Sequence, residues 1–302
     1  MVGARGFEPP TPCSQSRCAT GLRHTPNTHQ HSLCSPNGQP TELYDTLASV
    51  LPHASGEERE EMFMHAGKPM RGQPQPTRDA VAVLPQLRLS HHPVVAHKLT
   101  ILRDRTTDSA TFRHAMTDLT VCLAYEALAA MRSTPTRVQT PLEETDGTML
   151  GERFAIVPVL RAGLGMVDGF LTLFPSLQVW HIGLYRDEAS LQPVTYYNRL
   201  PALATVDTCF VLDPMLATGG SAVTTIAILK EWGARTVSYV GIIAAPYGVQ
   251  RLVDAHPDVS IHVAALDRAL NEDGYIVPGL GDAGDRLYRT SGDLSPSAER
   301  EA

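Results

Sequence analysis

The stretch from Val211 to Ser221, VLDPMLATGGS, constrains the fold of this 302-residue chain more than any other. It runs from an apolar segment through one acidic residue, Asp213, into a turn of small residues that opens a helix. Glycines let a ligand approach the backbone, and N–H groups at a helix start favour an anion. The hydroxyls of Thr218 and Ser221 add donors, and Asp213 can accept hydrogen bonds from sugar hydroxyls. We therefore predict a ribose-phosphate site here.

Two common kinds of glycine-rich loop do not fit this stretch. A nucleoside-triphosphate P-loop ends in Gly-Lys-Ser/Thr, but the first lysine after Gly220 is Lys230. The dinucleotide fingerprint G-x-G-x-x-G is not found in this loop either. A tight strand-to-helix turn that binds no ligand remains the alternative, because many glycine turns are only turns.

Strand-like and helix-like segments alternate along the rest of the chain. Apolar runs rich in β-formers predict strands, and apolar residues at helical spacing predict helices. The predicted strands are Phe154–Leu160, Val179–Tyr185, Thr208–Leu212, Val237–Ala244 and Ile261–Leu266, and the predicted helices are Thr111–Met131, Met166–Phe174, Ser221–Trp232 and Val249–Ala255. Strands joined through helices imply right-handed crossovers. We therefore predict an α/β fold with a mostly parallel sheet flanked by helices.

Three polar residues, Arg161, Arg186 and Asp213, each follow a predicted strand. Ligands of such sheets bind at the carboxyl ends of the strands, so we expect the three to converge on one crevice. Arg161 precedes an Ala-Gly-Leu-Gly turn, and its planar guanidinium suits bidentate contact with phosphate. The alternative for both arginines is an exposed surface position, with Arg186 weakly paired to Asp187 or Glu188.

Composition excludes some classes of protein. The net charge of −7 weighs against nucleic-acid binding as the main activity, and no apolar run approaches the ~20 residues of a membrane span. The 43% hydrophobic content suffices for a sizeable core. The cysteines show no metal-ligand spacing, which favours a reduced, cytoplasmic setting; they are Cys13, Cys18, Cys34, Cys122 and Cys209.

Residues 1–78 differ from the rest of the chain. Their start is rich in Pro, Ser, Thr, His and Gly, a composition typical of a disordered extension. Short helices are predicted at Thr41–Leu51 and Glu57–Met64, and we hypothesise that part of the extension is a misassigned start, with translation beginning at Met62, Met64 or Met70. The predicted globular domain spans 79–292, and 293–302 form a C-terminal tail.

Four motifs in order resemble the uracil phosphoribosyltransferases, a family of type I phosphoribosyltransferases. The first three are VPVLRAGLGM at 157–166, GLYRDE at 183–188 and LDPMLATGGS at 212–221. The fourth is LNEDGYIVPGLGDAGD at 270–285. The resemblance covers residues 81–289 and implies that uracil and 5-phosphoribosyl 1-diphosphate (PRPP) react to UMP and diphosphate in pyrimidine salvage.

The resemblance also implies the site residues. The residues implied to bind PRPP are Arg161, Arg186, Asp213, Pro214, Met215, Leu216, Ala217, Thr218, Gly219, Gly220, Ser221 and Asp282. Those implied to bind uracil are Ile276, Gly281, Asp282 and Ala283. Asp282 or a bound water is the candidate acceptor of the uracil N1 proton. A rigid loop without a ligand is the alternative for residues 275–284.

Cofactors and partners follow from the same resemblance. Asp213-Pro214 replaces the two adjacent acids of many phosphoribosyltransferases, so Mg²⁺ is expected to be held mainly by PRPP and water, with no protein ligand assigned. The family implies homo-oligomers, dimers or larger, and GTP as an activator. The alternatives are a transferase for another base and a nucleotide-sensing regulator that binds RNA.

Five further residues have plainer interpretations. His91, His92 and His97 favour a helix start or a subunit contact over catalysis. Trp180 and Trp232 lie on apolar faces and are predicted to be core or interface residues.

Overall fold

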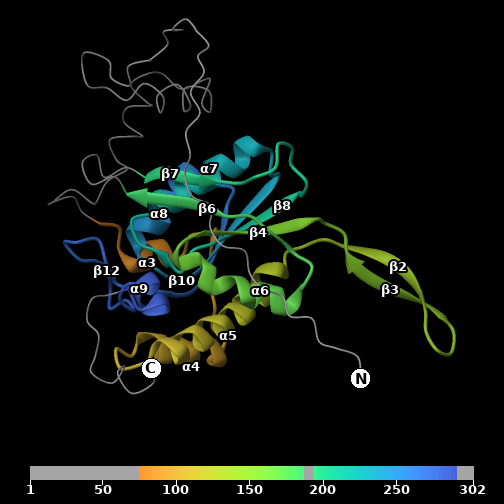
Figure 1. Cartoon of the computed structure of the whole chain (residues 1–302), viewed down its shortest axis with the longest axis horizontal. Helices are drawn as coiled ribbons and strands as arrows, with labels where there is room; N and C mark the ends of the chain where they lie inside the picture. The colour runs from red at the N-terminus through yellow and green to blue at the C-terminus, as the bar shows by residue number, and fades with distance from the viewer. Residues whose placement is uncertain (1–74, 187–192, 291–302) are drawn as a thin grey trace, which may run out of the picture. The chain divides into compact units, whose positions relative to one another are not determined.

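The structure is a computed structural model that describes residues 75–186 and 193–290; of residues 185, 186, 193 and 194 it describes the backbone. Its centre is one sheet with the strand order β1-β11-β10-β8-β4-β6-β7 (Figure 1). These strands are β1 (Leu87–Leu89), β4 (Phe154–Leu160), β6 (Ile182–Arg186), β7 (Pro193–Asn198), β8 (Thr208–Leu212), β10 (Thr236–Ala244) and β11 (Ser260–Leu266). Two short strands, β5 (Gln178–Val179) and β9 (Met215–Leu216), pair with β4 and β10.

Every pair in this sheet is parallel except β6 with β7. Helices connect the parallel strands, as right-handed crossovers require. The helices of the described residues are α3 (Arg78–Ala82), α4 (Pro93–Arg103), α5 (Ser109–Leu128), the 3-10 turn η1 (Ala162–Met166), α6 (Val167–Leu173), α7 (Gly220–Trp232), α8 (Pro246–Ala255) and α9 (Ala283–Tyr288); α3 precedes the first strand and α9 follows the last. The predicted fold class is confirmed.

The sheet is buried on both faces because successive side chains of a strand point to opposite sides. In β4, Ala155 and Val157 pack with the side chains of α7 and α8, whereas Ile156 packs with those of α4, α5 and α6. The helix α7 ends where expected, at Gly233, whose φ of 109° favours glycine.

Some details differ from the sequence-based predictions. The predicted strand Val179–Tyr185 is two strands, β5 and β6, and the predicted helix Thr111–Met131 is α5, which ends at Leu128. The hairpin of β2 (Ser133–Gln139) and β3 (Glu144–Leu150) was not predicted. Its residues are nearly all exposed, so they lack the alternating burial that reveals a strand.

The plainer interpretations of the histidine and tryptophan residues hold where they are tested. His92 caps α4, because its Nδ1 accepts the Val94 N–H at 3.2 Å. Trp180 and Trp232 pack edge to face with ring centres 4.8 Å apart, against the core.

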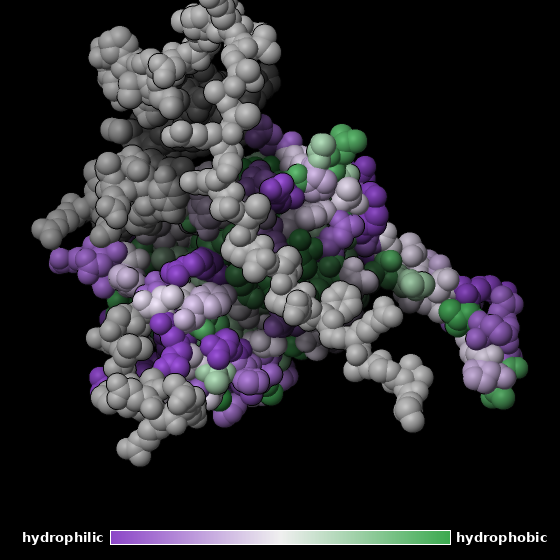
Figure 2. All heavy atoms as spheres, viewed as in Figure 1, coloured by the Kyte–Doolittle hydropathy of each residue, from purple (hydrophilic) through white to green (hydrophobic). Residues whose placement is uncertain are grey.

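The surface of the described residues adds two observations. The β2–β3 hairpin projects from the sheet and carries exposed apolar residues such as Leu142 and Met149 among hydrophilic ones (Figures 1 and 2). In the described part of the chain, no helix combines the length and apolar character that crossing a bilayer requires. The helices predicted at Thr41–Leu51 and Glu57–Met64 lie outside the described residues, as does 293–302.

Candidate functional site

The predicted anion loop is built at the carboxyl end of β8. Asp213 follows the strand, Met215 and Leu216 pair with β10 as β9, and α7 begins at Gly220. Gly219 takes a φ of 78°, a conformation that other residues rarely adopt, and this turns the chain into the helix. Asp213 and residues 215–222 line a hollow of about 110 Å³. The sequence therefore places loop, acid and helix start as predicted.

The loop is supported from behind by β10 and α8. The Tyr239 hydroxyl donates to the carbonyl oxygen of Asp213 at 2.8 Å, and Arg251 Nη1 donates to that of Thr218 at 3.1 Å. A Cβ at Gly248, in the first turn of α8, would lie 2.4 Å from the carbonyl oxygen of Ala217. This close packing fixes the shape of the turn before any ligand arrives.

Asp213 lies in an unusual electrostatic environment. Burial raises the pKa of its carboxyl group to about 7, opposed weakly by a 3.5 Å hydrogen bond from the Met215 N–H. Within the described residues it forms no ion pair. Hydroxyl donors from a ligand would stabilise the ionised form of such a carboxylate. Acids with a perturbed pKa that lie beside a hollow are candidates for function.

The Arg161 loop packs beside the start of the Asp213 loop. Gly163 in η1 packs so closely on the end of β8 that a Cβ there would lie 2.3 Å from the carbonyl oxygen of Leu212, the residue before Asp213. The Arg161 side chain is 59% exposed, with Nη2 3.5 Å from Asp285 Oδ1. Two of the three loops that were predicted to converge, those of Arg161 and Asp213, are therefore adjacent; a common binding site for their side chains stays a prediction.

The predicted base loop lies against the Arg161 loop. Ile276 is buried in β13 (Ile276–Val277), which pairs with β12 (Ala269–Leu270). Gly281 has a φ of 79°, and Asp282 caps α9 by accepting the Asp285 N–H at 2.9 Å. A Cβ at Gly284 would lie 3.3 Å from Asp282 Oδ1 and 3.9 Å from Arg161 Nη2. Asp282 and Arg161 therefore flank the same point.

Arg186 lies at the end of β6, where its backbone pairs with Pro193 of β7. The sequence predicted a strand end here, and the structure agrees. The side chain of Arg186 and residues 187–192, including Asp187 and Glu188, lie outside the described part. The proposed phosphate contact of Arg186 therefore stays a prediction.

Three residues that position the base loop were not predicted. Arg103, Asp267 and Arg286 hold the loop through hydrogen bonds to its backbone. Arg103 and Asp267 are 164 positions apart, and neither belongs to a recognisable motif. Only the α/β topology brings them together, so no local signal could have found them.

A protein-built metal centre is not found among residues 75–186 and 193–290, where no three His, Cys, Asp or Glu side chains come together. Asp213 is the single carboxylate lining the hollow. This donor set fits a cation that arrives with its own oxygen ligands better than one held in a protein cage.

The parallel sheet, the glycine turn after Asp213 and the arginine loop beside it define the class of phosphoribosyl-binding α/β proteins. Residues 89–290 match the sequence profile of uracil phosphoribosyltransferase. The uracil phosphoribosyltransferase of Roseiflexus castenholzii is 57% identical over 205 residues, covering 68% of this chain and 99% of that protein. That of Lactiplantibacillus plantarum is 50% identical over 200 residues, covering 66% and 96%.

A solved structure agrees. The AQ2163 protein from Aquifex aeolicus superposes with a TM-score of 0.65 and 36% identity, covering 68% of this chain and 99% of that one. The chain belongs to the uracil phosphoribosyltransferase family.

Proposed function

We propose that the chain transfers the phosphoribosyl group of PRPP to N1 of uracil, forming UMP and releasing diphosphate, as a step of pyrimidine salvage. The observation that carries this proposal is the convergence of the Asp213 loop, the Arg161 loop and the base loop at one edge of the sheet. Each loop offers the chemistry that one part of the two substrates needs.

The three loops divide the substrates between them. The glycine turn of residues 215–221 binds the sugar phosphate through backbone N–H groups at the start of α7. Asp213 accepts the ribose hydroxyls, and Arg161 binds the diphosphate. The backbone around Ile276 and residues 281–283 recognises the carbonyl and N–H groups of uracil, and Arg186 supplies a second contact with phosphate.

Catalysis rests on position and charge. Breaking the bond at C1′ builds positive charge on the ribose and negative charge on the departing diphosphate. The Asp213 carboxylate stabilises the first, and the Arg161 guanidinium stabilises the second. Asp282 or a bound water accepts the N1 proton; Asp282 already uses Oδ1 to cap α9, so its position is fixed.

Mg²⁺ belongs to this proposal as a cation carried by PRPP, coordinated by diphosphate and ribose oxygens. It would neutralise charge on the leaving diphosphate. The single carboxylate at the hollow supports this assignment. The proposal also includes a homo-oligomer, activation by GTP and a cytoplasmic location, with no nucleic-acid or membrane partner; the family resemblance supports the first two.

The test is formation of UMP from uracil, PRPP and Mg²⁺ by the full chain. Arg161→Ala and Asp213→Asn should each lower kcat/KM by about 100-fold, the worth of about 2–3 kcal/mol for a charged hydrogen bond. Arg153→Ala, at the opposite edge of the sheet, is the control and should stay close to wild type. Rapid turnover with hypoxanthine or guanine and none with uracil would overturn the proposal in favour of another base, and tight RNA binding without turnover would favour a regulator.

A further inference from the structure

The base loop, residues 275–284, is held at its middle by an ion pair between a half-buried arginine and a buried aspartate. Arg103, the last residue of α4, forms a fork with Asp267: Nη1 lies 2.9 Å from Oδ2 and Nη2 lies 2.5 Å from Oδ1. Arg103 Nη1 also donates to the carbonyl oxygen of Gly279 at 2.7 Å. Asp267, only 4% exposed, accepts the Gly279 N–H at 2.9 Å. Both backbone polar groups of Gly279 are therefore bound by the same pair.

Gly279 is a sensitive point of the loop. Its φ is 69°, and a Cβ there would lie 2.2 Å from the carbonyl oxygen of Ile276. It lies between Ile276 and Gly281, to which the proposed function assigns uracil contacts. The backbone at Gly279 therefore sets how these two groups face each other.

A second guanidinium ties the end of the loop to the same helix. Arg286 of α9 donates to the carbonyl oxygens of Leu280, Leu102 and Asp104, and its guanidinium carbon lies 4.3 Å from the centre of the Phe112 ring. A cation is favourable beside the carbonyls of Leu102 and Asp104 because they lie at the C-terminal end of α4. The loop is thus anchored at two successive residues, Gly279 and Leu280.

We propose that Arg103 and Asp267 form a positioning pair that sets how tightly and how selectively the site binds uracil, an inference that rests on the proposed function. The glycine turn that binds the sugar phosphate has separate supports, Tyr239, Gly248 and Arg251. Loosening the pair therefore weakens recognition of the base far more than recognition of PRPP, whose single contact in the base loop, Asp282, is also held by its own cap on α9.

Base selectivity follows from the same geometry. Uracil presents a carbonyl at C4 and an N–H at N3, whereas cytosine presents an amino group and an unprotonated nitrogen there. Backbone donors and acceptors that Gly279 holds in place bind cytosine poorly, because its different hydrogen-bonding groups would leave buried polar groups unpaired. A loop that can shift accommodates that mismatch and discriminates less.

The sharpest variant is Arg103→Lys. Lysine keeps the positive charge but cannot form the fork with Asp267 and also reach Gly279. We expect the KM for uracil to rise about tenfold, since small misplacements of a substrate are costly. The KM for PRPP should stay within about twofold of wild type. The rise in melting temperature on adding PRPP should also stay close to that of wild type. The preference for uracil over cytosine should fall. Asp267→Asn, which keeps the shape and removes the charge, should act in the same direction.

Two controls separate positioning from loss of stability. Arg132→Lys makes the same substitution in the ion pair with Glu152 and should leave both KM values unchanged. Val237→Ala removes buried apolar volume from the start of β10 and should lower the melting temperature without splitting the two KM values.

The outcomes are distinct. The inference fails if Arg103→Lys raises both KM values equally or neither, or if Val237→Ala reproduces the split at a similar melting temperature. A wild-type chain that makes no UMP overturns the proposed function itself, and this is seen before any variant is measured. An active wild type together with a selective rise in the uracil KM supports both.

Discussion

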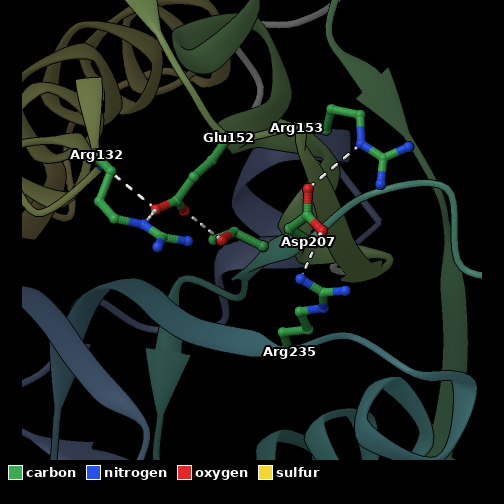
Figure 3. Close-up of polar contacts among 6 residues, drawn as sticks. Arg132, Glu152, Arg153, Asp207 and Arg235 are labelled. Carbon is green, nitrogen blue, oxygen red and sulfur yellow. Dashed lines mark hydrogen bonds and ion pairs between the residues drawn. The ribbon is translucent and has the colours of Figure 1, made fainter. Parts of the chain in front are cut away.

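Strand β8 carries an aspartate at each end, and the two lie in opposite electrostatic surroundings. Asp207, just before the strand, is bound by two arginines: Arg153 Nε at 3.3 Å and Arg235 Nη1 at 3.7 Å (Figure 3). The hydrogen bond from Arg153 holds the pKa of the Asp207 carboxyl below its usual range. Asp213, just after the strand, has no such partner among the described residues, and burial raises its pKa to about 7.

A second acid is paired with an arginine at the same end of the sheet, where the parallel strands begin. Glu152 accepts a hydrogen bond from Arg132 Nε at 2.6 Å and another from the Thr208 hydroxyl at 2.9 Å (Figure 3). The bond from Arg132 lowers the pKa of Glu152. At the amino ends of the strands the acids are paired within the protein, whereas at the carboxyl ends Asp213 is desolvated and lines a hollow. The comparison singles out Asp213 as the candidate for function, because a perturbed acid beside a hollow is a common mark of a binding site.

The largest expected effect comes from Asp213→Asn. The amide still fits the site but loses the negative charge that ribose hydroxyls and C1′ require. We expect kcat/KM to fall by about 100-fold, consistent with about 2–3 kcal/mol for hydrogen bonds to a charged group. Steady-state kinetics at pH 8 measure this, where the wild-type carboxyl is ionised. Activity near that of wild type would mean that the two ends of β8 do not differ in function.

The second effect tests whether the carboxyl edge depends on its support from α8. Gly248→Ala places a Cβ 2.4 Å from the carbonyl oxygen of Ala217 and 2.7 Å from that of Leu216, so the glycine turn must shift. We expect the KM for PRPP to rise about tenfold, in keeping with the cost of small displacements in a binding site.

The matched control for this change is Gly147→Ala in the hairpin. A Cβ at Gly147 meets its nearest neighbour, the Thr136 methyl carbon, at an ordinary 3.6 Å, so PRPP binding should not change. Equal effects of the two alanines would show that close packing behind the glycine turn does not matter.

The third effect uses pH to compare folding stability. The unfolded Asp213 loses its proton near pH 4, whereas the folded one keeps it up to about pH 7. The folded state therefore binds more protons in this range, and the free energy of unfolding of the wild type falls as pH rises from 4 to 7. Asp213→Asn lacks this titration and should become more stable than wild type.

The difference in free energy of unfolding between Asp213→Asn and wild type should widen by about 1 kcal/mol from pH 5 to pH 8. The upper limit is 1.36 kcal/mol for each unit of pKa shift, and the expected value is smaller because Asp213 as a whole residue is only half-buried. Urea unfolding without substrate measures it. A gap that stays constant across this range would show that Asp213 is not desolvated.

Much of the carboxyl edge could be predicted because it follows from local patterns and one rule of topology. Apolar runs give β4, β8 and β10, glycines mark the turns, and parallel strands bring their carboxyl ends together. That rule predicts that the Arg161 and Asp213 loops meet once the strands are placed, whereas Asp282 was assigned only through the family resemblance.

What supports that edge could not be predicted in the same way. Asp267 pairs with Arg103 only after α4 packs beside β11. Gly248 contacts Ala217 only because β10 pairs with β9 and leads directly into α8. The raised pKa of Asp213 depends on how deeply its carboxyl is buried, which no spacing along the chain reveals. The exposed hairpin was missed for a similar reason, since its polar residues carry no burial pattern.

The smallest effect comes from Asp207→Asn, the same substitution at the other end of β8. Its partners are largely exposed, and exposed ion pairs contribute little because water and salt screen them. The pKa of Asp207 is lowered on folding, so its contribution to stability is present at neutral pH and is lost as pH falls below about 4. We expect kcat/KM within about twofold of wild type, as for most surface changes. The melting temperature at pH 7 should drop slightly, and the difference from wild type should shrink on acidification, opposite in sign to Asp213→Asn. Parallel melting curves of the two variants at pH 3, 4, 5.5 and 7 check this, and shifts of the same sign would remove the contrast between the two ends of the strand.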